Sequence, residues 1–256
     1  MRISFSKSVT ESLLAKIRSG EMMSRNEKFN LIIQLSIPSI LAQVTTVLMF
    51  YIDAGMVGSL GAEPSAAIGL VEPATWLFFS LVSAVTMGFS VQVAHFIGAN
   101  DFAKARAVMR HGYIFGLCFA LFLLLITFLI GSRLPVWLGG GADIQHDATV
   151  YFLIFSLIIP FHLIEYMSAA MLKVSGDMRR PSFMAILMCV LDVIFNYFFI
   201  FPTRTVSLLG VEMTMPGLGE GVAGAALGSL LSFVCIALPL AYCAIFRSPI
   251  LAWKQD

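Results

Sequence analysis

Six apolar stretches of helical length constrain the fold of this 256-residue chain more than any other feature. A helix needs about 20 mostly apolar residues to cross the hydrocarbon core of a bilayer, whereas a strand of a membrane barrel needs about ten, with strict alternation. The sequence therefore predicts an all-α polytopic membrane protein with six transmembrane helices. The predicted helices cover residues 30–57, 66–97, 112–130, 150–172, 183–201 and 222–246.

Composition excludes several classes of protein. Hydrophobic residues make up 59% of the chain and charged residues 12%, whereas about a quarter of the residues in an average soluble domain are charged. This composition excludes a soluble enzyme, and a net charge of +1 without a basic patch argues against a nucleic-acid partner. The four cysteines lie inside apolar stretches without paired spacing, so no disulfide framework is predicted. An intramembrane serine protease would need a Gly-x-Ser-Gly segment, but Ser90 is followed by Val91, so no enzymatic activity is expected.

The distribution of lysine and arginine predicts how the chain is oriented. Fourteen of the sixteen fall in the N-terminal arm, the second and fourth loops and the C-terminal tail, whereas Arg133 and Arg204 fall on the other side. Because cytoplasmic loops carry the excess of positive charge, both termini are expected in the cytoplasm and the protein in the plasma membrane. The predicted organisation is an arm over residues 1–28, a six-helix bundle over residues 29–246, and a tail or the start of a linker over residues 247–256.

Asp53 lies where lipid makes an acid costly. An aspartate at the centre of a membrane helix opposes insertion by about 2.5–3.5 kcal/mol, so it marks a face turned to protein or water. Pro38, fifteen residues earlier, favours a bend in the same helix. Asp53 is predicted to bind a coupling ion or a proton, although a helix cap at the membrane surface would also place an acid here. Small or polar residues share its helix face, namely Ser39, Ala42, Thr46 and Met49.

Asp192 and Asn196 lie one helical turn apart and share a helix face. A carboxylate and an amide oxygen suit a small cation such as Na⁺, and a carboxyl group also binds and releases a proton. The alternative is a hydrogen-bonded pair that only holds two helices together. Glu72 and Glu165 are predicted to line a cavity, together with Thr46 and Met49. In the last predicted helix, small residues favour close helix packing, namely Gly221, Gly224, Ala225, Gly228 and Ser229.

Four segments resemble motifs of the multidrug and toxic compound extrusion (MATE) transporters. Each segment alone is weakly specific, but their order along the chain is more so. The first two are Asp53-x-x-x-Val57-Gly58-x-Leu60-Gly61, with Ala66-Ala67-Ile68-Gly69-Leu70 after it, and Gly98-Ala99-Asn100-Asp101. The others are Gly176-Asp177-Met178-Arg179-Arg180-Pro181, followed by Leu191-Asp192-x-x-x-Asn196-Tyr197-Phe198-Phe199-Ile200, and Gly221-Val222-Ala223-Gly224-Ala225-Ala226.

The resemblance implies an exporter that exchanges Na⁺ or H⁺ for organic cations or other amphiphiles and needs no cofactor. Members of this family contain two six-helix bundles around a central cleft, so the chain corresponds to the amino-terminal bundle. The matching positions imply a helix bend at Pro38. They also imply a cation site at Asp53, Asp192 and Asn196, completed by Ser229 and by Ala225 as a possible carbonyl ligand. The chain has aspartate then asparagine at the fifth-helix positions, where one branch of the family commonly has the reverse order.

Several alternatives stay open. The chain is either a fragment of a two-bundle transporter or a half-transporter that pairs with a partner, for which a parallel homodimer is geometrically possible. A lipid-linked sugar flippase of the same superfamily is an alternative function, but its basic cavity would need lysine or arginine in the spans. A further alternative is a membrane subunit that does not itself transport.

Overall fold

The computed structural model describes the chain except for residues 1–11, 14, 17–18, 209–210 and 254–256. Much of the predicted arm, together with Lys254 in the predicted tail, therefore lies outside the described residues. Within the described residues, six helical segments are long and apolar enough to cross a membrane, which confirms the predicted number of spans. They are α2 (Arg25–Gly58), α3 (Ala62–Gly98), α4 (Phe102–Gly131), α6 with α7 (Gln145–Ser156 and Ile158–Val174), α8 (Arg179–Ile200) and α9 (Gly221–Phe246).

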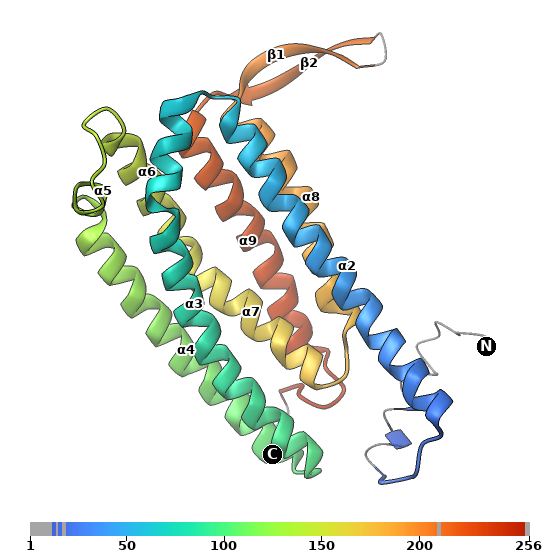
Figure 1. Cartoon of the computed structure of the whole chain (residues 1–256). Helices are drawn as coiled ribbons and strands as arrows, with labels where there is room; N and C mark the ends of the chain where they lie inside the picture. Colours follow the sequence, from blue (N-terminus) through green and yellow to red (C-terminus); the bar gives the residue numbers. More distant parts are fainter. Residues whose placement is uncertain (1–11, 14, 17–18, 209–210, 254–256) are drawn as a thin grey trace.

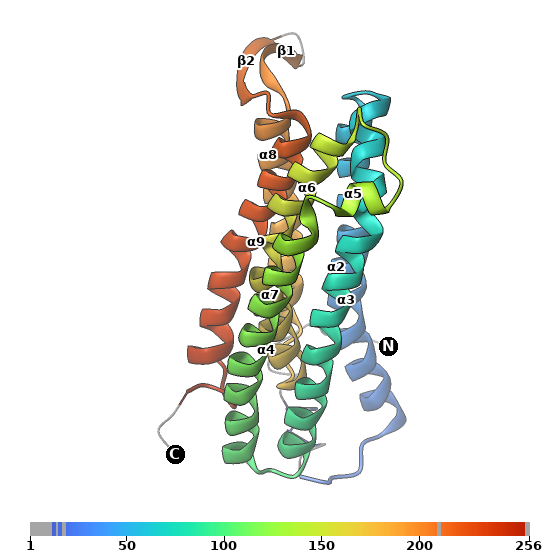
Figure 2. The same cartoon turned by 90° about the vertical axis from the view of Figure 1, so that its left-hand side faces the viewer.

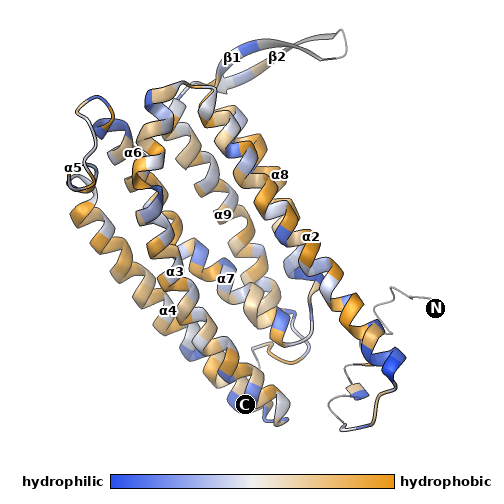
Figure 3. Ribbon diagram, viewed as in Figure 1, coloured by the Kyte–Doolittle hydropathy of each residue, from blue (hydrophilic) through white to orange (hydrophobic). Residues whose placement is uncertain are grey.

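The helices run up and down as one bundle (Figures 1 and 2). The start of α2 and the end of α9 lie at the same end of this bundle, called here the inner end. Apolar residues, coloured orange in Figure 3, predominate along these helices. Ile32, Met87 and Leu129 are each at least 60% exposed, which suits contact with lipid tails and would be unfavourable in water.

Several helices begin earlier than the sequence analysis predicts, and α4 differs most. It starts at Phe102, ten residues before the predicted span, because Asp101 caps it by accepting a hydrogen bond from the Lys104 backbone nitrogen at 3.1 Å. The basic residues assigned to the second loop therefore lie in the first turns of α4, which corrects that assignment. Apolarity locates the membrane-embedded part of a helix, whereas a capping residue locates its start.

The fourth predicted span is interrupted at Leu157, between α6 and α7. Proline has no backbone N–H, so Pro160 cannot donate to the carbonyl of Ser156 four residues earlier. The hydroxyl of Ser156 instead donates to the carbonyl of Phe152 at 2.6 Å, which holds the last turn of α6. A short helix missed by the sequence analysis, α5 (Leu134–Trp137), lies in the loop before α6.

A β-hairpin was also missed. Strands β1 (Pro202–Leu208) and β2 (Val211–Leu218) pair in antiparallel fashion, with Arg204 opposite Met215, and extend beyond the ends of the helices (Figure 1). Strand β1 contains two threonines and a valine, residue types with high strand propensity, whereas the sequence analysis considered only apolar runs of helical length. The guanidinium of Arg204 lies 4.2 Å from the ring of Phe201, and this stacking joins the hairpin to the end of α8.

Helices α8 and α9 pack closely because glycine lies between them. A Cβ atom at Gly224 would overlap the backbone of Phe199, and one at Gly228 would overlap Asn196. The predicted close packing is therefore confirmed at these two glycines. Gly221 serves a different purpose, since it has open space around it and a φ of +54°, the left-handed conformation that glycine tolerates at the start of α9.

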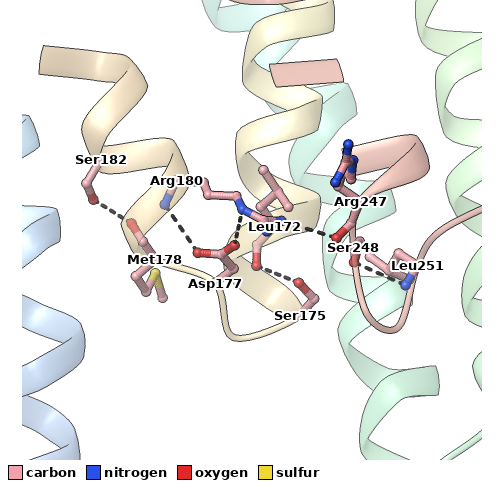
Figure 4. A network of polar contacts seen from close by, with 9 residues as sticks. All are labelled: Leu172, Ser175, Asp177, Met178, Arg180, Ser182, Arg247, Ser248 and Leu251. Atoms are coloured by element: carbon pink, nitrogen blue, oxygen red, sulfur yellow. Dashed lines mark hydrogen bonds and ion pairs between the residues drawn. The ribbon is translucent and has the colours of Figure 1, made fainter. Parts of the chain in front are cut away.

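Polar contacts close the inner end of the bundle (Figure 4). Arg180 pairs with Asp177 at 3.3 Å and donates to the backbone carbonyl of Arg247 at 3.2 Å, so the α7–α8 turn holds the end of α9. Arg106 of α4 donates to the carbonyl of Ile250 at 3.3 Å. Leu251 is fully buried in an apolar cluster between α3, α4 and α7. The described part of the C-terminal tail therefore packs against the bundle.

Candidate functional site

A cavity of about 680 Å³ lies between the helices and is lined by α2, α3, α6, α7, α8 and α9. It extends from Ser65, near the start of α3, to Lys173, near the inner end of α7. All the residues predicted to share the Asp53 face of α2 line this cavity, which agrees with the prediction that this face is turned to protein or water. The predicted site residues on the cavity wall are Thr46, Met49, Asp53, Glu72, Glu165, Asn196, Ala225 and Ser229.

Asn196 joins two carboxylates from different helices. Its side-chain nitrogen donates to Asp53 Oδ1 of α2 and to Asp192 Oδ2 of α8, each at 2.9 Å. Asp192 and Asn196 are each 1% exposed, whereas Asp53 is half-buried at the cavity wall. The structure thus brings together, as one cluster, three residues that are separated by up to 143 positions in the sequence.

The charges of this cluster are not balanced by a basic side chain. No lysine or arginine within the described residues forms an ion pair with Asp53 or Asp192. Two carboxylates that share one amide repel each other unless a proton or a cation neutralises part of their charge. Asn196 Oδ1 is buried and has no hydrogen-bond partner among the described residues, so it is free to accept from a donor or to bind a cation. These groups offer the hard oxygen ligands that a small cation prefers.

Helix α9 completes the cluster from the other side. The hydroxyl of Ser232 lies 3.2 Å from Asp192 Oδ1 and 2.8 Å from the carbonyl of Gly228, and donates to one of them at a time. The sequence analysis missed Ser232, although it lies three residues after Ser229 on the same helix face. Ser229 lines the cavity and contacts the Asp192 carboxylate. Ala225 lines the cavity one turn earlier.

The other predicted site residues lie apart from this cluster. Glu72 accepts a hydrogen bond from the indole nitrogen of Trp76 at 3.3 Å, within one turn of α3. Glu165 lies on α7, 4.0 Å from the ring of His162. Pro38 lies within α2, which continues through it to Gly58, so bending at this proline stays a prediction. No group of three or more His, Cys, Asp and Glu side chains suited to a metal ion occurs in the part of the chain that the structure describes.

Comparison with known proteins decides the family. The MatE family profile matches residues 38–198, which is more than half of the chain and contains both Asp53 and Asp192. The chain belongs to the MATE family. This membership confirms the resemblance seen in the sequence motifs.

Individual relatives agree with this assignment. A protein named probable multidrug resistance protein NorM, from Neisseria meningitidis, is 24% identical over 215 residues, which cover 83% of this chain and 44% of the relative. A solved structure of a MATE protein in the straight conformation superposes with a TM-score of 0.77 at 25% identity, over 88% of this chain and 47% of that one. A MOP superfamily transporter from Pyrococcus furiosus shares the fold, with a TM-score of 0.75, 23% identity and the same two coverages. The chain spans about half the length of the relatives it matches.

Proposed function

We propose that this chain forms the amino-terminal bundle of a MATE exporter that couples the entry of Na⁺ or H⁺ to the export of organic cations or other amphiphiles. The observation that carries the proposal is the bridge from Asn196 to both Asp53 and Asp192 beside the cavity. If Asp192 and Asn196 only held two helices together, a second carboxylate, that of Asp53, would not be needed on the cavity wall. A site that binds a cation or a proton needs such a group.

The cluster offers a simple means of coupling. Asp53 belongs to α2, whereas Asp192 and Asn196 belong to α8, so an ion bound between them attracts the two helices to each other. Loss of the ion restores repulsion between the carboxylates and favours a different position of α2. Pro38 provides the point at which α2 bends, because proline removes one helical hydrogen bond. An ion drives transport in this way only if it binds the two conformations with different affinity.

The position of basic residues supports the proposed orientation. Lys28, Arg106, Arg180 and Arg247 belong to the inner end of the bundle, whereas Arg204 belongs to the hairpin at the opposite end. A membrane protein retains such an excess of positive charge in the cytoplasm. We therefore propose that both termini of the chain lie in the cytoplasm and that the protein lies in the plasma membrane.

Transport across the membrane needs a second bundle, because a cleft between two bundles is the feature that alternately opens to each side. Either this bundle is followed by a second one in a longer chain, or a second copy of the chain takes that place as a parallel homodimer. The names of the curated relatives favour a drug exporter over the lipid-linked sugar flippase. The cavity wall agrees, since it carries three acids and one lysine, Lys173, where a flippase would need basic residues.

The test compares export by cells that produce wild-type protein, Asp53→Asn, or Glu63→Gln as the matched control. Glu63 is an exposed acid in the first turn of α3 and does not line the cavity. Asp53→Asn should reduce Na⁺- or H⁺-driven export of ethidium to background while the protein still inserts into the membrane, and Glu63→Gln should export like wild type. Coupled export by Asp53→Asn at the wild-type rate would falsify the assignment of the ion site.

A further inference from the structure

A column of five aromatic rings lines the cavity beside the acid cluster. Neighbouring rings along the column have centroids 5.2, 5.5, 4.4 and 5.6 Å apart, and the first three pairs are stacked within 20° of parallel. Every ring in the column also lines the cavity. In order, the rings are Tyr151 and Phe155 of α6, Phe79 of α3, and His162 and Tyr166 of α7.

One end of the ring column lies next to the cluster of Asp53, Asp192 and Asn196, and the other end lies on α7, away from that cluster. Tyr151 packs against Val57 and Ala225, close to the helix faces that carry Asp53 and Ser229. At the other end of the column, His162 and Tyr166 lie on α7, and the ring of His162 lies 4.0 Å from the Glu165 carboxylate. The column therefore connects the acid cluster to a second acid, Glu165, which contributes nothing to the first cluster.

Glu165 and His162 are polar side chains without a strong partner. Neither ring nitrogen of His162 has a hydrogen-bond partner among the described residues. Its Nδ1 lies 4.0 Å from Glu165 Oε2, too far for a hydrogen bond, and the two side chains are only 12% and 15% exposed. Leaving such groups unpaired in apolar surroundings costs free energy, so a ligand that supplies hydrogen-bond donors and acceptors would be favoured here.

The local charge favours a cationic ligand. Lys173 is the one lysine or arginine among the residues that line the cavity. It lies eight residues after Glu165 on α7, roughly 12 Å along the helix axis, and forms no ion pair with Glu165 among those described. Glu165 thus keeps its capacity to attract a positive group. Aromatic faces add to this attraction, because a cation within about 6 Å of a ring centroid is stabilised by the π electrons.

We propose that Glu165 and His162, with the ring column, form a second binding site for a flat aromatic cation that also carries N–H groups. An N–H group of the ligand lies between Glu165 and His162, donating to the carboxylate, and the flat, positively charged part lies along the rings. This proposal rests on the proposed function only in taking the cavity as the place where a transported molecule binds. It separates the residues that bind that molecule from the cluster that binds the coupling ion.

The test measures binding of ethidium, a flat aromatic cation, to the purified chain in detergent by its fluorescence. Glu165→Gln should weaken binding by about tenfold, as expected for loss of one buried charge interaction. Glu63→Gln, which alters an exposed acid outside the cavity, should bind like wild type. Asp53→Asn should weaken ethidium binding less than Glu165→Gln does, because its carboxylate belongs to the other cluster.

A neutral flat aromatic compound, pyrene, separates the role of charge from the role of shape. Glu165→Gln should leave its binding unchanged, whereas Phe79→Leu, which interrupts the ring column, should weaken the binding of both compounds. If Glu165→Gln does not fold, Glu165→Asp, which keeps the charge but retracts it, should bind ethidium with intermediate affinity.

Three results would overturn the proposal: no ethidium binding by the wild type, wild-type affinity in Glu165→Gln, or a greater loss of affinity in Asp53→Asn than in Glu165→Gln. The last result would assign the ligand to the acid cluster. None of these results bears on ion coupling, which is measured separately by export from cells that produce Asp53→Asn.

Discussion

The cavity contains two polar clusters that differ in how their hydrogen bonds are satisfied. Asp53, Asp192 and Asn196 bond to one another across two helices, with Ser232 as a further donor. His162 and Glu165 lie on one helix, face the same cavity, and form no hydrogen bond with each other. The groups of the first cluster already bond to one another, so this cluster suits a small ligand, an ion or a proton, that fits between its oxygens. The groups of the second cluster have no hydrogen-bond partners among the described residues, so this cluster suits a larger ligand that supplies hydrogen-bond donors and acceptors.

The largest effect is expected at Gly228, where α8 and α9 pack closely next to Asn196 of the first cluster. Gly228→Ala places a Cβ where Asn196 lies, 2.8 Å from its backbone nitrogen, so α8 and α9 must separate or Asn196 must move. We expect loss of the response to Na⁺ or H⁺ and a decrease in the free energy of unfolding of about 1–3 kcal/mol. Thermal unfolding in detergent and an ion titration measure both effects.

The control for this variant is Gly88→Ala. Gly88 lies within α3 with open space around its Cα, so an added methyl group meets nothing. Its unfolding temperature should equal or exceed that of wild type, because alanine favours helix more than glycine does. Equal destabilisation by both substitutions would show that close packing at Gly228 is not what positions Asn196.

A second pair of substitutions compares the clusters directly. Asn196→Leu leaves the buried carboxylate of Asp192 and the half-buried one of Asp53 without their shared donor, and should lower the free energy of unfolding by about 1–3 kcal/mol. His162→Phe removes nitrogens that have no partner and keeps a ring in the column, so it should be neutral or stabilising. Chemical unfolding of the purified proteins measures both. Equal costs for the two substitutions would contradict the difference in hydrogen bonding between the clusters.

The smallest effect is expected at Ser232. Ser232→Ala removes one donor to Asp192 and leaves the donor from Asn196, so the apparent affinity for Na⁺ or H⁺ should change by a few-fold, or about 0.5–1.5 kcal/mol. Ser83→Ala is the matched control, because Ser83 lines the same cavity but its hydroxyl bonds only to the carbonyl of Phe79 in its own helix. An unchanged titration in Ser232→Ala would remove Ser232 from the ion site.

The sequence predicts the fold better than the ends of its elements. Helix-length apolar runs are sufficient for the number of spans, because lipid excludes unpaired backbone groups. The break at Leu157 could be predicted only from the inability of Pro160 to donate to the carbonyl of Ser156, and the start of α4 only from the cap at Asp101. The β-hairpin was missed because the prediction considered only apolar runs of helical length.

The polar clusters show a similar limit. Asp53, Asp192 and Asn196 stand out in the sequence because lipid makes such residues costly. Their bridge could not be predicted from helix faces alone, since it depends on how closely α2 approaches α8. The aromatic column was not anticipated at all, because phenylalanine is common on every face of a membrane helix.

The central claim is that a cation or proton binds between Asp53 and Asp192, and Trp76 offers the most direct test of it. Trp76 lies on the cavity wall, 5.2 Å from the ring of Phe50, which is three residues from Asp53 on α2. With the other two tryptophans, Trp137 and Trp253, replaced by phenylalanine, its fluorescence is recorded while Na⁺ or pH is varied. A saturable change that is kept in Glu165→Gln and lost in Asp53→Asn is the expected result. If the fluorescence of Trp76 changed with Na⁺ or pH in Asp53→Asn in the same way as in the protein that keeps Asp53, the claim would be contradicted.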